Sequence, residues 1–250
     1  MAGLHALANP AKFLRLTDAL MPWCAGAAAL GIAAGLYLGL VEAPADYQQG
    51  ETVRIMFVHV PSAWLALGLY TAMALASASG LIWRHPVADL LAKATAPVGA
   101  GFTLIALVTG SLWGKPMWGT WWVWDARLTS VLVLFFLYLG YMAIWEAYDD
   151  PTRGARAAAI LALVGFINVP IVKFSVDWWN TLHQPASVVK AGGPAIHPAI
   201  LTPLLVMAAG FFAFAALVVM IRAQGEIAER RLRAIRMAEA RGERPGEARP

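Results

Sequence analysis

Residues 197–221 read HPAILTPLLVMAAGFFAFAALVVMI, a run without Asp, Glu, Lys or Arg. Crossing the hydrocarbon core of a bilayer takes about 20 apolar residues, so this run predicts a transmembrane helix. The whole chain of 250 residues has the same character, with 60% hydrophobic residues, 14% charged residues and a mean hydropathy of +0.62. Soluble domains contain only about 45–50% apolar residues. The composition therefore predicts a polytopic membrane protein.

Further apolar runs of spanning length precede this one, at residues 19–41, 57–82, 94–113, 128–145 and 157–172. Helices satisfy their own backbone hydrogen bonds in lipid, so we predict an all-α integral membrane protein with six transmembrane helices. The first run is longer than the roughly 7–15 apolar residues of a signal peptide, and we keep it as a helix. We expect residues 1–222 to form one transmembrane domain and residues 223–250 a basic cytoplasmic tail.

The basic residues are distributed unevenly over the two sides that six spans would create. Fourteen of the nineteen fall on the side that carries both termini. The opposite side has only five, namely Arg54, Lys115, Arg127, Lys173 and Lys190. The positive-inside rule then predicts that both termini are cytoplasmic. This asymmetry also accounts for the net charge of +4 without a nucleic-acid partner.

The tail after Arg222 is predicted to be a polar helix or a frayed segment, with Glu226 before Arg230 and Glu229 before Arg233 at supportive helical spacing. Its arginines favour an anchor on the anionic lipid surface of the bilayer. Docking of a cytoplasmic partner is the alternative.

Several kinds of chemistry are excluded or disfavoured by what the chain lacks. Cys24 is the single cysteine, which excludes an internal disulfide, a CxxC redox pair, a CxxCH haem attachment site and a thiolate metal cluster. The sequence contains no GxxxxGK[ST] motif for binding nucleotide phosphates. Charged residues are missing from the middle of every predicted span, which disfavours a charge-coupled pump.

The predicted outer segment that begins at Trp113 is rich in tryptophan. It holds five of the eleven tryptophans of the chain, Trp113, Trp118, Trp121, Trp122 and Trp124. An aromatic belt at the membrane interface is one interpretation. The other is a shaped apolar platform, in which Trp118, Trp121, Trp122 and Trp124 would share one face if the segment folds as a short interfacial helix, with Asp125 and Arg127 as its polar edge. Such a platform would suit a large, planar, anionic ligand.

Two histidines are predicted on the same outer side, His59 at the start of the second span and His183 after the fifth. A lone histidine near an interface is usually structural. Two neutral imidazoles on one face, however, could supply both axial ligands of a haem iron. His197, at the start of the last span, is the rival to His183.

Haem carries two propionates, and Arg54 and Arg127 are the candidate cations on this side because guanidinium pairs well with carboxylate. The alternatives are that Arg54 only extends to the interface at a helix end and that Arg127 forms an ion pair with Asp125.

Three stretches together resemble the haem exporter protein C (CcmC) family of the cytochrome c maturation system, whose hallmark is a tryptophan-rich WWD motif. They are RIMFVHVPSAW at 54–64, LVTGSLWGKPMWGTWWVWDARLTS at 107–130 and SVDWWNTLHQ at 175–184. The resemblance implies a six-helix protein of the bacterial inner membrane. It implies that haem b lies between a periplasmic WWD segment, about 113–129, and the axial pair His59 and His183. It also implies a complex with the ABC subunits CcmA and CcmB and the small membrane subunit CcmD.

From this resemblance we predict that the chain binds haem b at the periplasmic surface and presents it to the haem chaperone CcmE during c-type cytochrome biogenesis. ATP hydrolysis would belong to another subunit, so we predict no enzyme, although assistance with covalent attachment of haem to the chaperone stays open. The predicted haem contacts are Trp113, Trp118, Trp121, Trp122, Trp124, Asp125, Arg54 and Arg127. One alternative is a b-haem electron-transfer subunit, which is disfavoured because no histidine lies in the middle of a span. Another is a haem-translocating channel.

Overall fold

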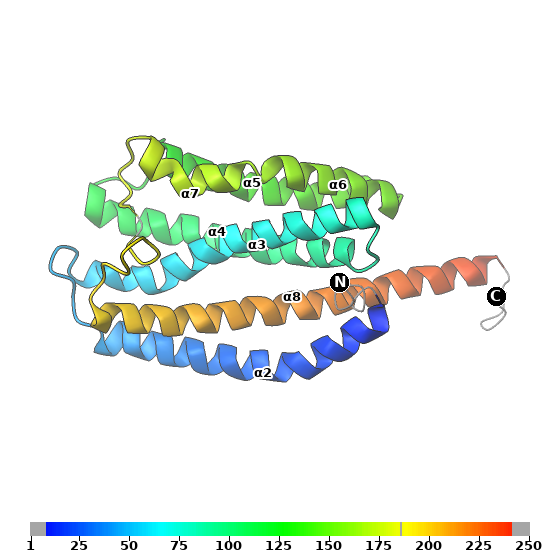
Figure 1. Ribbon diagram of the computed structural model, residues 1–250, viewed down its shortest axis with the longest axis horizontal. Helices are drawn as coiled ribbons and strands as arrows, with labels where there is room; N and C mark the ends of the chain where they lie inside the picture. Colours follow the sequence, from blue (N-terminus) through cyan, green and yellow to red (C-terminus); the bar gives the residue numbers. More distant parts are fainter. Residues whose placement is uncertain (1–8, 186, 242–250) are drawn as a thin grey trace.

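The computed structural model describes residues 9–185 and 187–241, which form a bundle of long helices that run roughly along one axis (Figure 1). The helices are α2 (Pro10–Tyr37), α3 (Met56–Trp83), α4 (Ala88–Trp118), α5 (Ala126–Ala147), α6 (Pro151–Gly165), α7 (Asn168–Trp178) and α8 (Pro198–Ala240). A π-helical turn, η1 (Leu38–Glu42), extends α2, and a 3-10 turn, η2 (Glu51–Ile55), leads into α3. Within the described residues, six helical segments are long and apolar enough to cross a membrane, as predicted from the sequence.

The first span begins earlier than the apolar run suggested. The Asn9 side chain accepts a hydrogen bond from the backbone N–H of Ala11 at 2.9 Å, and Pro10 occupies the first helical position. Both features start helices, so α2 includes the polar residues that precede the run. Pro22 lies inside α2, and Figure 1 shows the N-terminal half of this helix bending away from the line of the rest.

The fifth span is not the single helix that we predicted over residues 157–172. It consists of α6 and α7, which meet at Phe166 and Ile167. Pro170 lacks the N–H that would bond to the Phe166 carbonyl in a regular helix. That carbonyl accepts instead from the N–H of Val169 at 3.0 Å, which tightens the chain at the junction. Asn168 begins α7 and donates from its side chain to the Ser130 carbonyl of α5 at 2.8 Å, which fixes the break against its neighbour.

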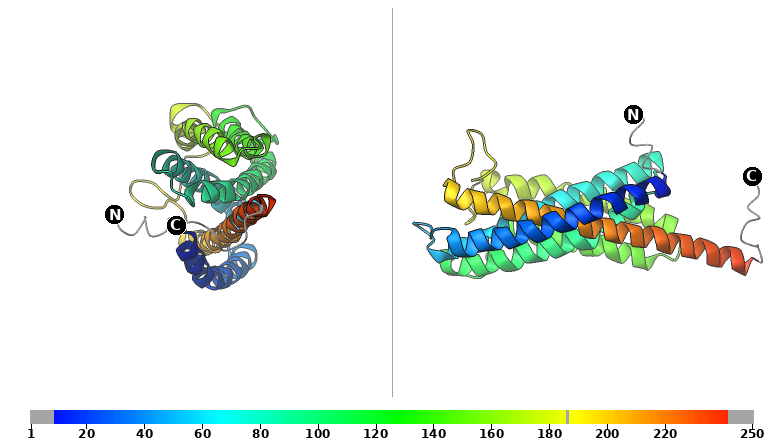
Figure 2. Two further views of the ribbon diagram at one scale, coloured as in Figure 1. Left: turned by 90° about the vertical axis from the view of Figure 1, so that its right-hand side faces the viewer. Right: turned by 90° about the horizontal axis from the view of Figure 1, so that it is seen from below.

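The last helix, α8, continues without interruption past the predicted end of the span at residue 221 and through to Ala240. At 1.5 Å per residue its 43 residues make a helix about 65 Å long, roughly twice the thickness of a hydrocarbon core. Its C-terminal part projects beyond the other helices (Figures 1 and 2). The first part of the predicted tail is therefore helical, whereas residues 242–250 lie outside the described part.

An ion pair holds α8 to α4 where the projecting part begins. Lys93 Nζ lies 2.8 Å from Glu226 Oε2, and both side chains are mostly buried. Arg230 donates to the Pro86 carbonyl at 3.0 Å. Glu226 therefore pairs across to α4 and not with Arg230 along its own helix, whereas Glu229 and Arg233 form the predicted i,i+4 pair.

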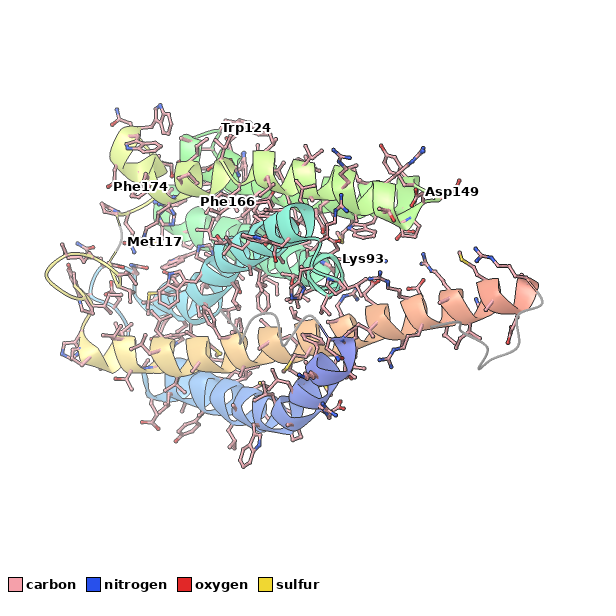
Figure 3. The ribbon with its side chains drawn as sticks, turned by 45° about the vertical axis from the view of Figure 1, so that its right-hand side comes forward. Lys93, Met117, Trp124, Asp149, Phe166 and Phe174 are labelled. Atoms are coloured by element: carbon pink, nitrogen blue, oxygen red, sulfur yellow. The ribbon has the colours of Figure 1, made fainter. Side chains whose placement is uncertain are left out.

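The two ends of the bundle differ in their connections. The start of α2 and the projecting part of α8 lie at one end, together with Lys93 and Asp149 (Figure 3). Met117 and Phe174 lie at the other. That second end also holds η2 and the irregular segments at residues 119–125, 179–185 and 187–197. The outer segments of the sequence analysis thus meet at one end of the molecule.

Candidate functional site

A cavity of about 300 Å³ opens at this second end, between α3, α4, α5, α7 and the segment that leads into α8. This volume falls at the lower edge of the range for small-molecule sites. Its walls are mainly apolar. The polar and aromatic side chains that line it are Gln49, His59, Trp64, Ser111, Trp113, Trp118, Trp122, Arg127, Lys173, Asp177, His183, Gln184 and Ser187.

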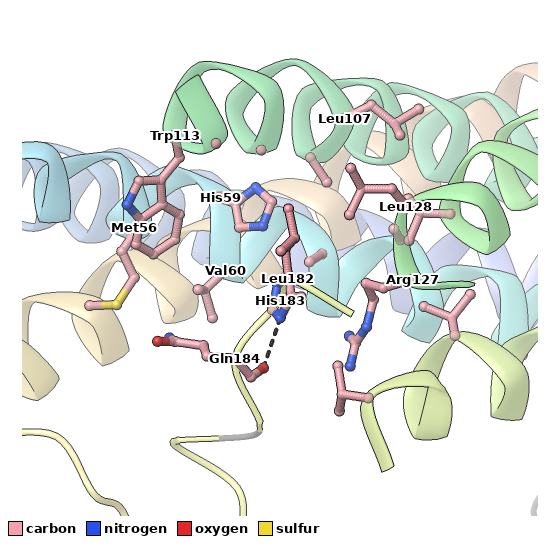
Figure 4. Close-up of a pocket in the computed structure, with 18 of the residues that line it drawn as sticks. Met56, His59, Val60, Leu107, Trp113, Arg127, Leu128, Leu182, His183 and Gln184 are labelled. Carbon is pink, nitrogen blue, oxygen red and sulfur yellow. Dashed lines mark hydrogen bonds between the residues drawn. The ribbon is translucent and has the colours of Figure 1, made fainter. Parts of the chain in front are cut away.

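His59 lies in the first turn of α3 and is half-buried. Its Nδ1 atom is 3.0 Å from the hydroxyl of Thr109 on α4. The ring of Trp113 meets the His59 ring edge to face, with 5.7 Å between the centroids. His59 is therefore held by α4 on two sides while its ring borders the cavity (Figure 4).

His183 reaches the same cavity from the irregular segment after α7 (Figure 4). Its Nδ1 atom lies 2.8 Å from the backbone carbonyl of Gln184. A carbonyl only accepts, so Nδ1 carries the proton and Nε2 keeps its lone pair. Burial and the nearby charge of Arg127 lower the pKa of His183. Both effects favour the neutral imidazole that a metal ligand requires.

A hydrogen bond joins the segment around His183 to the tryptophan-rich loop. Asp125 Oδ1 accepts from the backbone N–H of Leu128 at 2.8 Å and so caps α5, and Oδ2 accepts from the N–H of Leu182 at 3.3 Å. The alternative that Asp125 forms an ion pair with Arg127 is not found, since the carboxylate bonds to backbone groups instead. Asp125 positions the residue before His183.

The five tryptophans of the outer segment do not share one face. Trp118 is the last residue of α4, and residues 119–125 form an irregular loop, so the short interfacial helix that we considered does not form. Gly119 permits the turn, with a φ of 76°. Trp113, Trp118 and Trp122 line the cavity. Trp121 and Trp124 lie outside it, with exposed fractions of 54% and 77%.

The two predicted cations lie in different surroundings. Arg127 lines the cavity, and its buried Nε atom has no hydrogen-bond partner among the described residues. Arg54 is not a lining residue, because its guanidinium pairs with Glu51 and donates to the Gly39 carbonyl at 2.8 Å. Lys173 does line the cavity. It was not predicted as a site residue, although it is one of only five basic residues on the predicted outer side.

Gln49 and Thr109 were also missed from the sequence. Gln49 belongs to no recognisable metal or haem pattern, and Thr109, although it lies in the stretch 107–130, is not a residue type that binds haem iron. Gln49 accepts from Trp113 Nε1 at 3.0 Å, and Thr109 contacts His59. The rival histidine, His197, is exposed and caps the start of α8, where its Nδ1 accepts from the Ala199 N–H at 3.2 Å. It does not line the cavity.

The residues of this cavity suit a haem better than a free metal ion. No group of three or more His, Cys, Asp or Glu side chains that could hold a metal occurs in residues 9–185 and 187–241. Two imidazoles, in contrast, match the two axial positions of a haem iron. The aromatic walls offer a surface for the haem ring, and the unpartnered Arg127 Nε is a donor for a propionate carboxylate.

Comparison with known proteins gives a consistent picture over nearly the whole chain. The family model described as heme exporter protein C (CcmC) matches residues 3–238. The chain is 58% identical to the heme exporter protein C of Bradyrhizobium diazoefficiens, over 94% of this chain and 89% of the relative. The protein of that name from Escherichia coli K12 is 49% identical over 88% of each chain. That from Paracoccus denitrificans is 47% identical over 94% and 97%.

Proposed function

The chain belongs to the haem exporter protein C family, and we propose that it binds haem b in the cavity between His59 and His183 and presents it to a haem chaperone during cytochrome c biogenesis. The observation that carries the proposal is the meeting of these two histidines, from segments far apart in the sequence, in one tryptophan-lined cavity. Haem is here the cargo of a transport system and not the cofactor of an enzyme.

The ring and the propionates would be held by different residues. Trp113, Trp118 and Trp122 offer aromatic surface to the macrocycle. Arg127 is the first candidate for a propionate, with Lys173 beside the same cavity. Arg54 already forms an ion pair with Glu51, and we therefore assign it a structural role and no contact with haem. Asp125 would act indirectly, through the segment that carries His183.

The distribution of basic residues indicates which side of the membrane the cavity faces. The end with the cavity carries few basic residues, and the opposite end carries the arginines of α8, so the positive-inside rule supports a periplasmic cavity in the inner membrane. The exposed Trp121 and Trp124 fit the membrane interface. We propose CcmE as the acceptor of haem and CcmA, CcmB and CcmD as the other subunits of the complex.

The proposal is tested on the purified wild-type protein in detergent. We expect the oxidised and reduced absorption spectra of a six-coordinate b-type haem, and movement of that haem to an added soluble domain of the chaperone. A protein that binds no haem, or binds it with one axial ligand, would contradict the proposal. Rapid haem reduction by a quinol would point instead to the electron-transfer alternative.

A prediction about the aromatic walls follows from the division of the tryptophans. Trp122→Ala removes a ring that lines the cavity, and we expect it to lower the haem content of the purified protein several-fold, in line with the roughly 1–3 kcal/mol that a stacked aromatic side chain contributes to base binding. Trp124→Ala removes an exposed ring two residues away and should leave the haem content near that of wild type. Haem is measured by pyridine haemochrome assay against protein concentration. An equal loss of haem in both variants would contradict the assignment of Trp122, but not Trp124, to the haem site.

A further inference from the structure

Thr109 is the only side chain with a hydrogen bond to His59 among the described residues. It lies on α4, one turn before Trp113, and faces α3 across the interface of the two helices. The His59 ring also packs closely on Gly110, where a Cβ atom would lie 2.9 Å from His59 Cε1. The surface of α4 thus fixes both the plane of the ring and the contact of its Nδ1 atom.

The direction of the bond between Thr109 and His59 can be deduced from its second partner. The Thr109 hydroxyl lies 2.6 Å from the carbonyl of Ile105, one turn earlier on α4, and 3.4 Å from the more distant carbonyl of Ala106. A carbonyl cannot donate, so the single hydroxyl proton is directed to Ile105. The Thr109 oxygen must then accept from His59, which places the imidazole proton on Nδ1.

This assignment leaves Nε2 of His59 without a proton and with a lone pair for a metal. The Gln184 carbonyl produces the same tautomer at His183. In metal sites the hydrogen bond at one imidazole nitrogen sets which nitrogen binds and raises the basicity of the ligand. The two hydrogen bonds, from His59 to Thr109 and from Thr109 to the Ile105 carbonyl, point in the same direction and polarise each other, which strengthens both.

We infer that Thr109 is a positioning residue for haem ligation, which fixes the tautomer and orientation of His59 so that Nε2 faces the iron. The inference rests on the proposed function, because it requires His59 to be an axial ligand. A threonine whose hydroxyl bonds only to its own helix cannot orient a histidine, and this protein contains such a threonine for comparison. Thr103, also on α4, donates to the Gly99 carbonyl at 2.7 Å and is fully buried.

The experiment compares Thr109→Val with Thr109→Ser and with Thr103→Val in the purified full-length protein. Valine keeps the shape of threonine but removes the acceptor. Loss of such an outer partner typically weakens metal binding by about 10–100-fold, so we expect Thr109→Val to weaken haem binding about tenfold. The midpoint potential of the haem should rise, because a less basic imidazole stabilises ferric iron less. Thr109→Ser should restore both values, and Thr103→Val should change neither.

Wild-type affinity and potential in Thr109→Val, or an equal change in Thr103→Val, would overturn the inference. If Thr109→Val does not accumulate as folded protein, Thr109→Ala gives the same readings without a branched side chain. His59→Ala is measured in parallel. If it leaves the haem six-coordinate, the proposed function itself has failed. If it removes six-coordination while Thr109→Val equals wild type, only the role of Thr109 is rejected.

Discussion

Replacing either axial candidate, in His59→Ala or His183→Ala, is expected to remove the six-coordinate spectrum. Loss of a side chain that hydrogen-bonds to a metal ligand weakens metal binding by roughly 10–100-fold. Loss of the ligand itself should lower haem binding by more than that. Each variant deletes one of two imidazoles that border the cavity. Absorption spectra of the ferric and ferrous protein, with haem quantified per chain, provide the measurement. Added imidazole should restore six-coordination, because it can occupy the space that the side chain leaves.

The matched control for these variants is His197→Ala. His197 follows His183 in the same connection between α7 and α8, but it is exposed and caps α8. Its loss should weaken the start of that helix by about 1 kcal/mol and leave the haem spectrum unchanged. Loss of the spectrum in His197→Ala, together with full retention in His183→Ala, would show that the ligand assignment is wrong.

The second large effect concerns the attachment of α2 to the bundle. At the point where α2 crosses α8, a Cβ atom on Gly31 would lie 2.7 Å from the Cα atom of Gly210, and one on Gly210 would lie 2.6 Å from the backbone nitrogen of Ile32. Gly35, four residues further along, meets the backbone of Met207 in the same way. Such small residues let transmembrane helices approach closely, and α2 packs mainly on α8.

We therefore expect Gly31→Leu to separate these two helices and to lower the free energy of unfolding by about 3 kcal/mol, the upper range for overpacking a tight contact. Gly26→Leu is the matched control on the same helix, because a Cβ atom there has open space around it. Thermal unfolding in detergent, followed by circular dichroism, measures both variants. Equal stability of Gly31→Leu and Gly26→Leu would mean that this crossing does not hold α2 in place.

Much of the site could be predicted from the sequence because it depends on which end of a span a residue occupies. His59 starts one span, Trp118 ends the next, and His183 follows the fifth, so an alternating path through a bilayer brings them to one end. The residues that contact the histidines could not be found in this way. Thr109 lies in the recognised stretch 107–130, but its contact with His59 exists only because α3 packs against α4.

The loop after Trp118 shows the same limit. From the sequence, Trp118, Trp121, Trp122 and Trp124 could share a face, as they would on a short helix. The irregular path of residues 119–125 instead directs Trp122 into the cavity and Trp124 outward. The direction of a side chain in a loop depends on backbone angles that hydrogen bonds to other segments fix, such as the bond of Ser111 to the Trp121 carbonyl at 2.7 Å.

The six spans and the clustering of the outer segments follow from the apolar runs alone, because backbone groups in lipid must bond within a helix. The pairing of side chains, in contrast, depends on how the helices pack. Glu226 pairs with Lys93 of α4 although Arg230 stands four residues away on its own helix, and Arg127 faces the cavity while Asp125 bonds to Leu182. These choices rest on distances between segments that no local pattern encodes.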